Sequence, residues 1–441
     1  MTDHYRTEPN PPSTAWVADD LRERKKPYYD YAGLKRWRSA LARCLFGLAI
    51  AAGMGAAAHA AEPIRIGSIF DLTGGLNIYG IQQREALHLA VADINSRGGV
   101  LGQPVQIVES DAQSEQSKYT QYANTMIMRD HIAALFAGLT SSSREAIRPV
   151  ARRSDTLYFY SSLYEGGVCD GNTFITGPSA SQQLKVLIKW SIERYGKRIY
   201  IMAADFNFGT ISAAWVRAYA KEFGAEVVGA DFIPLTVTDF SSTIQKIEAA
   251  RPDFVFALPV GANQTGFLEQ FAAAGLKKKI GVVSTNFGSG NQQVVVSPDA
   301  SDGIVVSLSY LDGIDTPQNR AFKAKWQAAY GTTEPIVEAA ADVWDAVHLW
   351  AAAANKANSV EPGKVRQALE SNLSFDAPNG LATLQARSHH LKQNIFLARG
   401  NRARGFDVIA VYPSVAPSYE DEKCDLLKNP RTATQFTSTG S

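Results

Sequence analysis

The sequence has no excess of charge of either sign. Lys+Arg 44 against Asp+Glu 43 gives a formal net charge of +1 over 441 residues. After residue 60 no run of Lys or Arg is longer than Lys277-Lys278-Lys279. Proteins that bind nucleic acid usually carry a basic surface, so no nucleic-acid partner is expected. A chain of this length is expected to form two or more domains.

The chain also lacks the short motifs of common catalytic sites. Gly288-Ser289-Gly290 lacks the third glycine of a dinucleotide-binding loop. The Gly-x-Ser-x-Gly elbow of serine hydrolases is absent. Ser141 or Ser162 as a nucleophile would need a positioned histidine, and the sequence does not suggest one. An amidase-like hydrolase is therefore a weak alternative, and we expect a protein that is not an enzyme.

Histidine is scarce, and the whole chain contains only seven histidines. His389 and His390 are adjacent in a predicted hairpin, where their side chains should point to opposite faces. A pair in solvent at the turn, or packed on the sheet, is favoured over a metal site. No metal and no cofactor are expected.

Residues 1–60 differ from the rest of the chain. Met1–Tyr31 is polar and proline-containing, which predicts disorder. A basic patch, the apolar run Leu45–Ala58 and the sequence Ala58-His59-Ala60 follow. These features predict a secretory signal peptide that is cleaved before Ala61. The alternative is an uncleaved membrane anchor, but the run is short and rich in Gly and Ala, so no stable membrane insertion is expected after cleavage.

Cysteine is rarer still, with three cysteines in the whole chain. Cys44 lies at the front of the apolar run, whereas a lipoprotein cysteine would lie at its end. Cys169 and Cys424 therefore remain in the exported chain. Two cysteines in an exported protein are more often paired than free. We hypothesise a Cys169–Cys424 bridge that ties the C-terminal tail to the lobe carrying Cys169.

The stretch from Ala134 to Gly167 contains two junctions between a buried strand and a polar turn. A short apolar strand ends at Gly138 and is followed by Thr140 to Ser143, hydroxyl residues typical of a helix N-cap. A second strand, Leu157–Tyr160, runs into Ser161 to Glu165. In an open parallel α/β sheet, ligands bind at the carboxyl ends of the strands. The stretch is therefore predicted to form half of a small-molecule site.

Strand and helix patterns alternate along most of the remaining chain. A first series begins with the strand Ile64–Phe70, and a second with the strand Arg198–Ala203. Such alternation predicts parallel, doubly wound α/β units. The expected later elements include helices over Gln318–Tyr330 and Ile336–Lys356 and a hairpin from Leu381 to Arg399, whereas 413–441 is expected to be a tail with little core.

Aromatic and small polar residues gather at the predicted carboxyl ends of the strands in both series. The aromatic rings could wall an apolar slot, and the hydroxyl and amide groups could orient a ligand in it. The candidate ligand-binding residues are Tyr79, Leu139, Thr140, Ser141, Tyr160, Ser162, Leu163, Tyr164, Phe206, Phe208, Gly261, Asn286 and Phe287. Glu165 could receive a ligand N–H or could equally serve as a carboxylate at a helix end or hinge.

Several segments together resemble the type I periplasmic binding proteins, and most closely the branch that binds urea and short-chain amides. The resemblance extends from about Ile64 to about Arg399. The segments that carry it are Ser141–Arg144 with Pro149-Val150, Tyr160–Gly166, Thr176-Gly177 with Gln182-Gln183, Asp205-Phe206 with Phe208, Asp315-Thr316-Pro317, and Ala377-Pro378 with Gly380 and His389-His390.

The resemblance implies two Rossmann-like α/β lobes joined by three crossovers, closing on the ligand like a hinged clamp. It implies lobe I at 61–178 and 307–376, lobe II at 179–306 and 377–412, and a tail at 413–441. Ser141 would hydrogen-bond the ligand, Tyr160 would form an aromatic wall, and Ser162 would contribute its hydroxyl and backbone N–H.

Amide binders carry tyrosines where this chain has Phe206 and Phe208, and an aromatic residue where it has Leu139. The loss of phenolic hydroxyls implies a ligand that is larger or less polar than acetamide or urea. The resemblance implies a periplasmic receptor that delivers a small ligand to the permease subunits of an ABC importer. A cytoplasmic ligand-sensing regulator on the same fold is the alternative, and it would lack the export signal.

Overall fold

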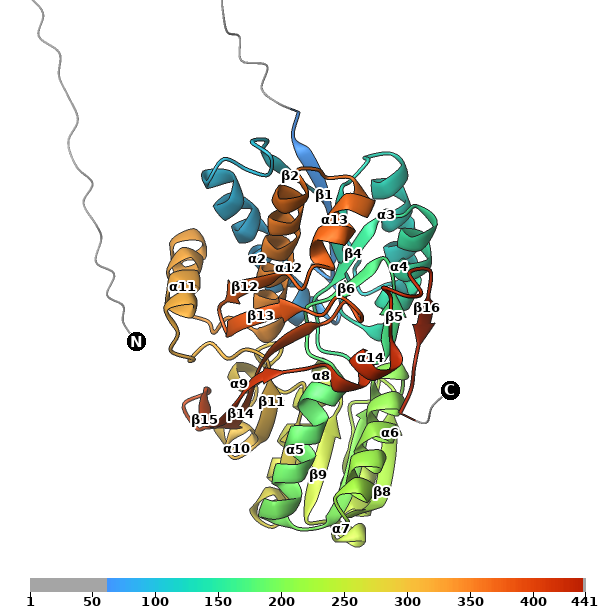
Figure 1. Ribbon diagram of the computed structural model, residues 1–441. Coiled ribbons are helices and arrows are strands. Elements are labelled where there is room, and N and C mark those ends of the chain that lie inside the picture. The colour runs from blue at the N-terminus through green and yellow to red at the C-terminus, as the bar shows by residue number, and fades with distance from the viewer. Residues whose placement is uncertain (1–61, 439–441) are drawn as a thin grey trace, which may run out of the picture. The chain divides into compact units, whose positions relative to one another are not determined.

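Two largely parallel sheets organise residues 62–438, the part of the chain that the computed structural model describes (Figure 1). The predicted signal peptide lies outside the described residues. No helix within 62–438 has the length and apolar character needed to cross a membrane.

The first sheet has the strand order β2-β1-β3-β4-β6, and all its pairs are parallel. Its strands are β1 (Ile64–Phe70), β2 (Val105–Asp111), β3 (Ala134–Ala137), β4 (Leu157–Tyr160) and β6 (Thr173–Ile175). The helices α2 (Asn77–Ser96), α3 (Gln116–Met128) and α4 (Ser141–Arg153) connect successive strands. Every residue of β3 and β4 is buried, as expected for parallel strands that helices cover on both faces.

The second sheet repeats this order over its parallel part, β8-β7-β9-β10-β11. Its parallel strands are β7 (Arg198–Ala204), β8 (Glu226–Ile233), β9 (Phe254–Leu258), β10 (Gly281–Ser284) and β11 (Val305–Leu308). The helices are α5 (Ala180–Tyr195), α6 (Asn207–Glu222), α7 (Ser241–Ala250) and α8 (Ala262–Ala273), with the short α9 (Gln292–Val295) and α10 (Pro298–Ser301) before β11. The predicted α/β fold with two Rossmann-like lobes is confirmed.

The chain passes between the two sheets more than once. After β6 it enters α5 beside the second sheet, and after β11 it returns through α11 (Pro317–Tyr330), α12 (Glu338–Ala357) and α13 (Pro362–Leu369). Helix α12 packs against α2 of the first lobe (Figure 1). The chain then crosses back, and β12 (Ser374–Ala377), β13 (Gly380–Leu384), β14 (Leu391–Gly400) and β15 (Phe406–Val415) extend the second sheet from the β11 edge in antiparallel fashion.

The C-terminal part is more structured than its composition indicates. The sequence analysis did not predict β15, which continues into the segment assigned to the tail. Beyond β15, α14 (Ser418–Lys423) is followed by β16 (Ala433–Gln435), which pairs antiparallel with β5 (Val168–Asp170). Cys169 and Cys424 form a disulfide with Cα atoms 5.5 Å apart. The tail is ordered by partners more than two hundred residues away in the chain, and local patterns do not reveal such partners.

His389 and His390 are both buried at the turn before β14. The His389 ring stacks on Phe174 with ring centroids 4.3 Å apart and hydrogen-bonds Glu370 at 3.0 Å. The His390 ring hydrogen-bonds the Tyr164 hydroxyl. Of the two arrangements considered from the sequence, the pair adopts the packed one.

Candidate functional site

A cavity lies where loops from both sheets meet, and its empty volume is about 460 Å³. The first lobe contributes α2, the residues after β3 and β4, and the start of α12. The second lobe contributes the residues after β7, β9 and β10. The lining residues are Tyr79, Leu139, Thr140, Ser141, Tyr160, Ser162, Leu163, Phe206, Phe208, Val260, Asn286, Ser289, Glu338 and Ala339.

Local chemistry at the start of α4 forms one wall of the cavity. Gly138 has φ +83°, a conformation that glycine adopts without strain, and it turns the chain out of β3. Thr140 then caps the helix by accepting a hydrogen bond from the backbone N–H of Ser143 at 3.1 Å. The Ser143 hydroxyl in turn accepts the backbone N–H of Leu139 at 3.1 Å. These bonds place Leu139, Thr140 and Ser141 on the cavity wall.

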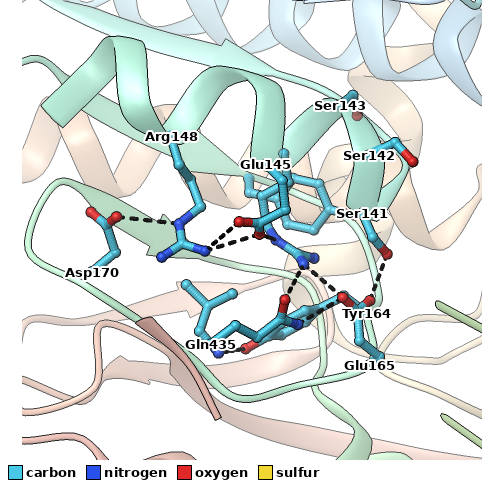
Figure 2. Close-up of polar contacts among 12 residues, drawn as sticks. Ser141, Ser142, Ser143, Glu145, Arg148, Tyr164, Glu165, Asp170 and Gln435 are labelled. Carbon is cyan, nitrogen blue, oxygen red and sulfur yellow. Dashed lines mark hydrogen bonds and ion pairs between the residues drawn. The ribbon is translucent and has the colours of Figure 1, made fainter. Parts of the chain in front are cut away.

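The Ser141 hydroxyl donates a 2.7 Å hydrogen bond to Oε2 of Glu165, which lies in the turn after β4 (Figure 2). Both side chains are buried, Ser141 at 2% exposed and Glu165 at 0%. Two roles were left open for Glu165: contact with a ligand N–H, and a carboxylate at a helix end or hinge. Glu165 does not line the cavity, and its carboxylate lies behind Ser141.

Tyr160 ends β4 and forms part of the aromatic wall. Its hydroxyl donates to the backbone carbonyl of Leu139 at 2.5 Å, and burial raises its pKa well above the usual range. The phenol therefore stays neutral, and its proton is donated to the Leu139 carbonyl within the first lobe. The aromatic ring of Tyr160 is the part of the side chain that can contact a ligand in the cavity.

The second lobe presents an apolar wall. Phe206 and Phe208 lie at the start of α6 with ring centroids 6.2 Å apart and an interplanar angle of 36°. Phe208 is 7% exposed. Val260, after β9, adds an aliphatic surface that the sequence analysis did not include.

Tyr79 links the two lobes across the cavity. Its hydroxyl oxygen accepts the backbone N–H of Gly261 at 3.2 Å and the side-chain amide of Gln292 at 2.7 Å. Burial raises the pKa of Tyr79 to about 12. Because both lone pairs of the Tyr79 oxygen accept hydrogen bonds, Tyr79 can interact with a ligand only by donating its hydroxyl proton.

Glu338, at the start of α12, brings a carboxyl group to the cavity. Oε1 accepts the backbone N–H of Ser309 at 2.5 Å and the Ser309 hydroxyl at 2.9 Å. Oε2 has no hydrogen-bond partner within residues 62–438. Burial raises the pKa of Glu338 to about 8. No motif pointed to this residue, and α12 also carries Asp342 and Asp345, so its local sequence does not set Glu338 apart.

Comparison with known proteins identifies the family. Residues 63–405 match the family model described as periplasmic binding protein. The chain belongs to the periplasmic binding protein family.

Relatives and solved structures agree with this assignment. The Leu/Ile/Val-binding protein homolog 7 of Brucella melitensis is 24% identical over 309 residues, which cover 66% of this chain and 76% of the relative. A solute-binding protein of an ABC transporter from Rhodopseudomonas palustris, solved with 3,4-dihydroxybenzoic acid, superposes with a TM-score of 0.73 at 19% identity and covers 81% of this chain and 99% of that one.

A branched-chain amino acid transporter substrate-binding protein from Streptococcus pneumoniae, solved with isoleucine, gives a TM-score of 0.70 at 20% identity. The match covers 80% of this chain and 99% of that one. At these identities the structural likeness concerns the fold.

Three predicted site residues of this periplasmic binding protein do not line the cavity. Phe287 is 0% exposed and packs edge-on against Phe406 in the core. Tyr164 lies behind the wall, where its hydroxyl contacts His390 and the backbone N–H of Val168. Gly261 is adjacent to the cavity and contributes only through its bond to Tyr79. All three follow strands, but a turn presents only some of its side chains to one side.

Conversely, the sequence analysis missed four lining residues of the periplasmic binding protein: Val260, Ser289, Glu338 and Ala339. Asn286 does line the cavity, but its carbonyl oxygen accepts hydrogen bonds from Gln264 and Ser284 and its amide donates to the carbonyl of Pro259. The side-chain amide of Asn286, which the sequence analysis predicts to orient a ligand, is thus already hydrogen-bonded within the second lobe.

Among residues 62–438, those that line the cavity of this periplasmic binding protein include no Lys, Arg or His. Within the described residues no group of three or more His, Cys, Asp or Glu could hold a metal ion. The lining combines aromatic and aliphatic surface with a few hydroxyls and one carboxyl group, a composition that favours binding of a small, partly apolar organic compound.

Proposed function

We propose that this protein is an extracytoplasmic solute-binding receptor of an ABC importer. It binds a small amide, urea, amino acid or related compound in the cavity between the lobes. The observation that carries the proposal is the cavity itself, because aromatic and polar residues from both lobes, among them Ser141, Ser162 and Phe208, line one common space.

The mechanism we propose is hinge closure. A ligand that contacts the loops of both lobes gains its full set of contacts only when the lobes approach one another, so it stabilises the closed arrangement. Tyr79 takes part in this closure because its hydroxyl already bonds residues of the second lobe. Permease subunits would then recognise the closed form.

The chemistry of the lining supports a compact ligand with at least one hydrogen-bonding head group and an apolar or aromatic body. Phe206 and Phe208 offer ring surfaces without hydroxyls, which favours a ligand less polar than acetamide or urea. Benzoates and isoleucine, the ligands of three structural neighbours, are likewise compact compounds that combine a polar head group with an apolar part.

Export to the periplasm is part of the proposal. It is supported by the signal-peptide pattern before Ala61 and by the family to which the chain belongs. N-terminal sequencing of protein from the native cell separates a receptor from a cytoplasmic ligand-sensing regulator. A receptor begins at Ala61, whereas a regulator retains the residues before it.

The direct test is a thermal-shift screen with amides, ureas, amino acids and small aromatic acids, followed by calorimetry on compounds that raise the melting temperature. Ser141→Ala is expected to weaken binding about fivefold or more, and Phe208→Ala about tenfold or more. Both variants should remain folded. Phe232→Ala removes a 38% exposed ring outside the cavity and serves as the control. Unchanged affinity in both cavity variants would exclude this site.

An amidase-like hydrolase is the second candidate function, and the same compounds test it. The Ser141 hydroxyl donates to the Glu165 carboxylate. Burial acts to raise the pKa of Glu165, but the charge and hydrogen bonds of Arg144 outweigh it and hold the pKa below its usual value, so this carboxylate is a weak base for an amidase-type nucleophile. Incubation with any amide that binds is expected to return it intact. Release of ammonia at a rate that depends on Ser141 would overturn the receptor assignment.

A further inference from the structure

Glu165 is the centre of a buried polar network behind the cavity wall. Its Oε1 receives Nη2 of Arg144 at 2.6 Å and Nε2 of Gln435 at 2.7 Å, and its Oε2 receives the Ser141 hydroxyl at 2.7 Å. Figure 2 shows Ser141 and Gln435 converging on the Glu165 carboxylate from two sides. The side chains of Arg144 and Glu165 are both 0% exposed.

The network keeps Glu165 ionised. Burial acts to raise the pKa of Glu165, but the charge of Arg144 and the hydrogen bonds from Arg144, Gln435 and Ser141 outweigh it and hold the pKa below its usual value. An ionised carboxylate can only accept hydrogen bonds. In the 2.7 Å contact between the two side chains, Ser141 must therefore be the donor.

This direction determines what Ser141 can offer a ligand. A serine hydroxyl has one proton and two lone pairs, and here the proton is used by Glu165. If Ser141 turned its proton towards a ligand, Oε2 of Glu165 would lose the one hydrogen bond that residues 62–438 give it. Depriving a buried charged group of a partner disfavours that arrangement about tenfold or more. Ser141 therefore faces the cavity as an acceptor.

The position of Glu165 is fixed from several directions. Nε1 of Trp215, on α6 of the second lobe, donates to the Glu165 backbone carbonyl at 3.0 Å. Gln435 also donates to the carbonyl of Gly166 at 3.0 Å and accepts Nη2 of Arg144 at 3.3 Å. Gln435 belongs to β16, the strand that pairs with β5, and Cys424 links the same C-terminal segment to β5. The tail thus supplies one of the donors that hold the carboxylate.

We propose that Glu165 is a specificity-determining positioning residue, held by Arg144 and by Gln435 of the C-terminal strand, which fixes Ser141 as a hydrogen-bond acceptor. The group of the ligand that faces Ser141 is then a donor, such as the N–H of a carboxamide or urea, and not a carboxylate. This inference rests on the proposed receptor function. It adds to that function the chemical polarity of the ligand at this end of the cavity.

The test uses two probes of the same shape, benzamide and benzoate, with affinities measured by calorimetry at pH 7.5. The wild-type protein is expected to bind benzamide about tenfold or more tightly than benzoate. Glu165→Gln is expected to bring the ratio close to one, because a glutamine side chain can either accept from or donate to Ser141. A ratio unchanged from wild type in a folded Glu165→Gln variant would overturn the inference.

Glu145→Gln is the matched control. Glu145 lies on the same helix as Ser141, and its side chain ion-pairs with Arg144 at 2.9 Å and with Arg148 at 2.7 Å. Within residues 62–438 no hydrogen bond joins the Glu145 side chain to the Ser141 hydroxyl. The substitution therefore removes the same charge from the same network. The benzamide-to-benzoate ratio of this variant should equal that of the wild type. A change as large as that in Glu165→Gln would show a general charge effect and overturn the inference.

Ser141→Ala keeps the proposal falsifiable if Glu165→Gln does not fold. Loss of an acceptor should weaken benzamide about fivefold or more and leave benzoate unchanged or slightly improved. A larger loss for benzoate would mean that Ser141 acts as a donor, which overturns the inference. If the wild-type protein binds neither probe nor any compound of the wider screen, the proposed receptor function itself fails. If it binds amides and the ratios do not respond as stated, only the role of Glu165 fails.

Discussion

The hydroxyl of Tyr79 and the side-chain amide of Gln292 are 2.7 Å apart, and this hydrogen bond joins α2 of the first lobe to α9 of the second. The backbone N–H of Gly261 makes a second link to the same oxygen at 3.2 Å. A Cβ atom at Gly290 would come within 2.5 Å of the Tyr79 ring, so only glycine permits this close approach without a shift. Tyr79 is therefore both a wall of the cavity and a contact between the lobes.

Tyr79→Phe should weaken ligand binding while the fold is retained. The variant loses the inter-lobe hydrogen bonds and the free hydroxyl proton, which together correspond to about 0.5–1.5 kcal/mol or more. Calorimetry on the best compound from the screen measures the change. Tyr330→Phe is the control, because the Tyr330 hydroxyl donates to the backbone of Glu85 at 2.6 Å away from the cavity. Equal affinities for both variants would contradict the role given to Tyr79.

Gly177→Ala should damage the site through the backbone of Ser162. A Cβ atom at Gly177 would lie 2.1 Å from the carbonyl carbon and oxygen of Ser162 and 2.7 Å from the N of Leu163. Backbone atoms cannot swing aside, so the turn after β4 must move, and both melting temperature and affinity should fall. Gly313→Ala is the control, since its added Cβ would meet no atom within 4 Å. Wild-type affinity in Gly177→Ala would show that the position of this turn does not matter.

The disulfide between Cys169 and Cys424 closes a sequence separation of 255 residues. Long loops lose much conformational entropy when they are cross-linked, so Cys424→Ser should cost about 2–5 kcal/mol of stability. The measurement is chemical unfolding in a Cys44→Ser background, in which Cys169 and Cys424 are the remaining cysteines. Thiol titration of the unfolded, unreduced protein should detect no free thiol in this background, and two free thiols would refute the bridge.

Stability should depend on pH through Glu338. Burial raises its pKa from 4.5, the ordinary value of a glutamate, to about 8. A carboxyl group whose pKa is raised by folding favours the folded state fully below pH 4.5, and this contribution is lost as the pH rises through 8. Glu338→Gln should therefore melt above the wild type at pH 8, by roughly 3 °C or more, and the gap should narrow towards pH 5.

The exposed Glu334 provides the comparison for this pH effect, because Glu334→Gln removes a charge on the same connection without a burial cost. Its melting temperature should follow that of the wild type at every pH. Differential scanning calorimetry between pH 5 and pH 9 distinguishes the two variants. A gap between wild type and Glu338→Gln that grows towards acid pH would reverse the sign and contradict the prediction.

Much of the architecture could be predicted from local patterns. The strands Ile64–Phe70 and Leu157–Tyr160 have the bounds that the sequence predicts. Most residues of the first strand and all residues of the second are buried, as expected for parallel strands that helices cover on both faces. The N-cap at Thr140 and the polar turn after Tyr160 were also readable, since both depend on residues within a few positions of one another. These features locate the loops at the carboxyl ends of the strands.

The sequence alone determined which segments become strands, helices and capped turns, and therefore which loops could meet at a site. Tertiary structure decided which side chains of those loops face the cavity: Glu338 enters from a distant helix, whereas Phe287 turns into the core. It also decided that Gln435 completes the network around Glu165, and that Ser141 faces a ligand as an acceptor. The physical reason is that hydrogen-bond direction and burial depend on neighbours brought together by folding, and the residues adjacent in the chain do not specify those neighbours.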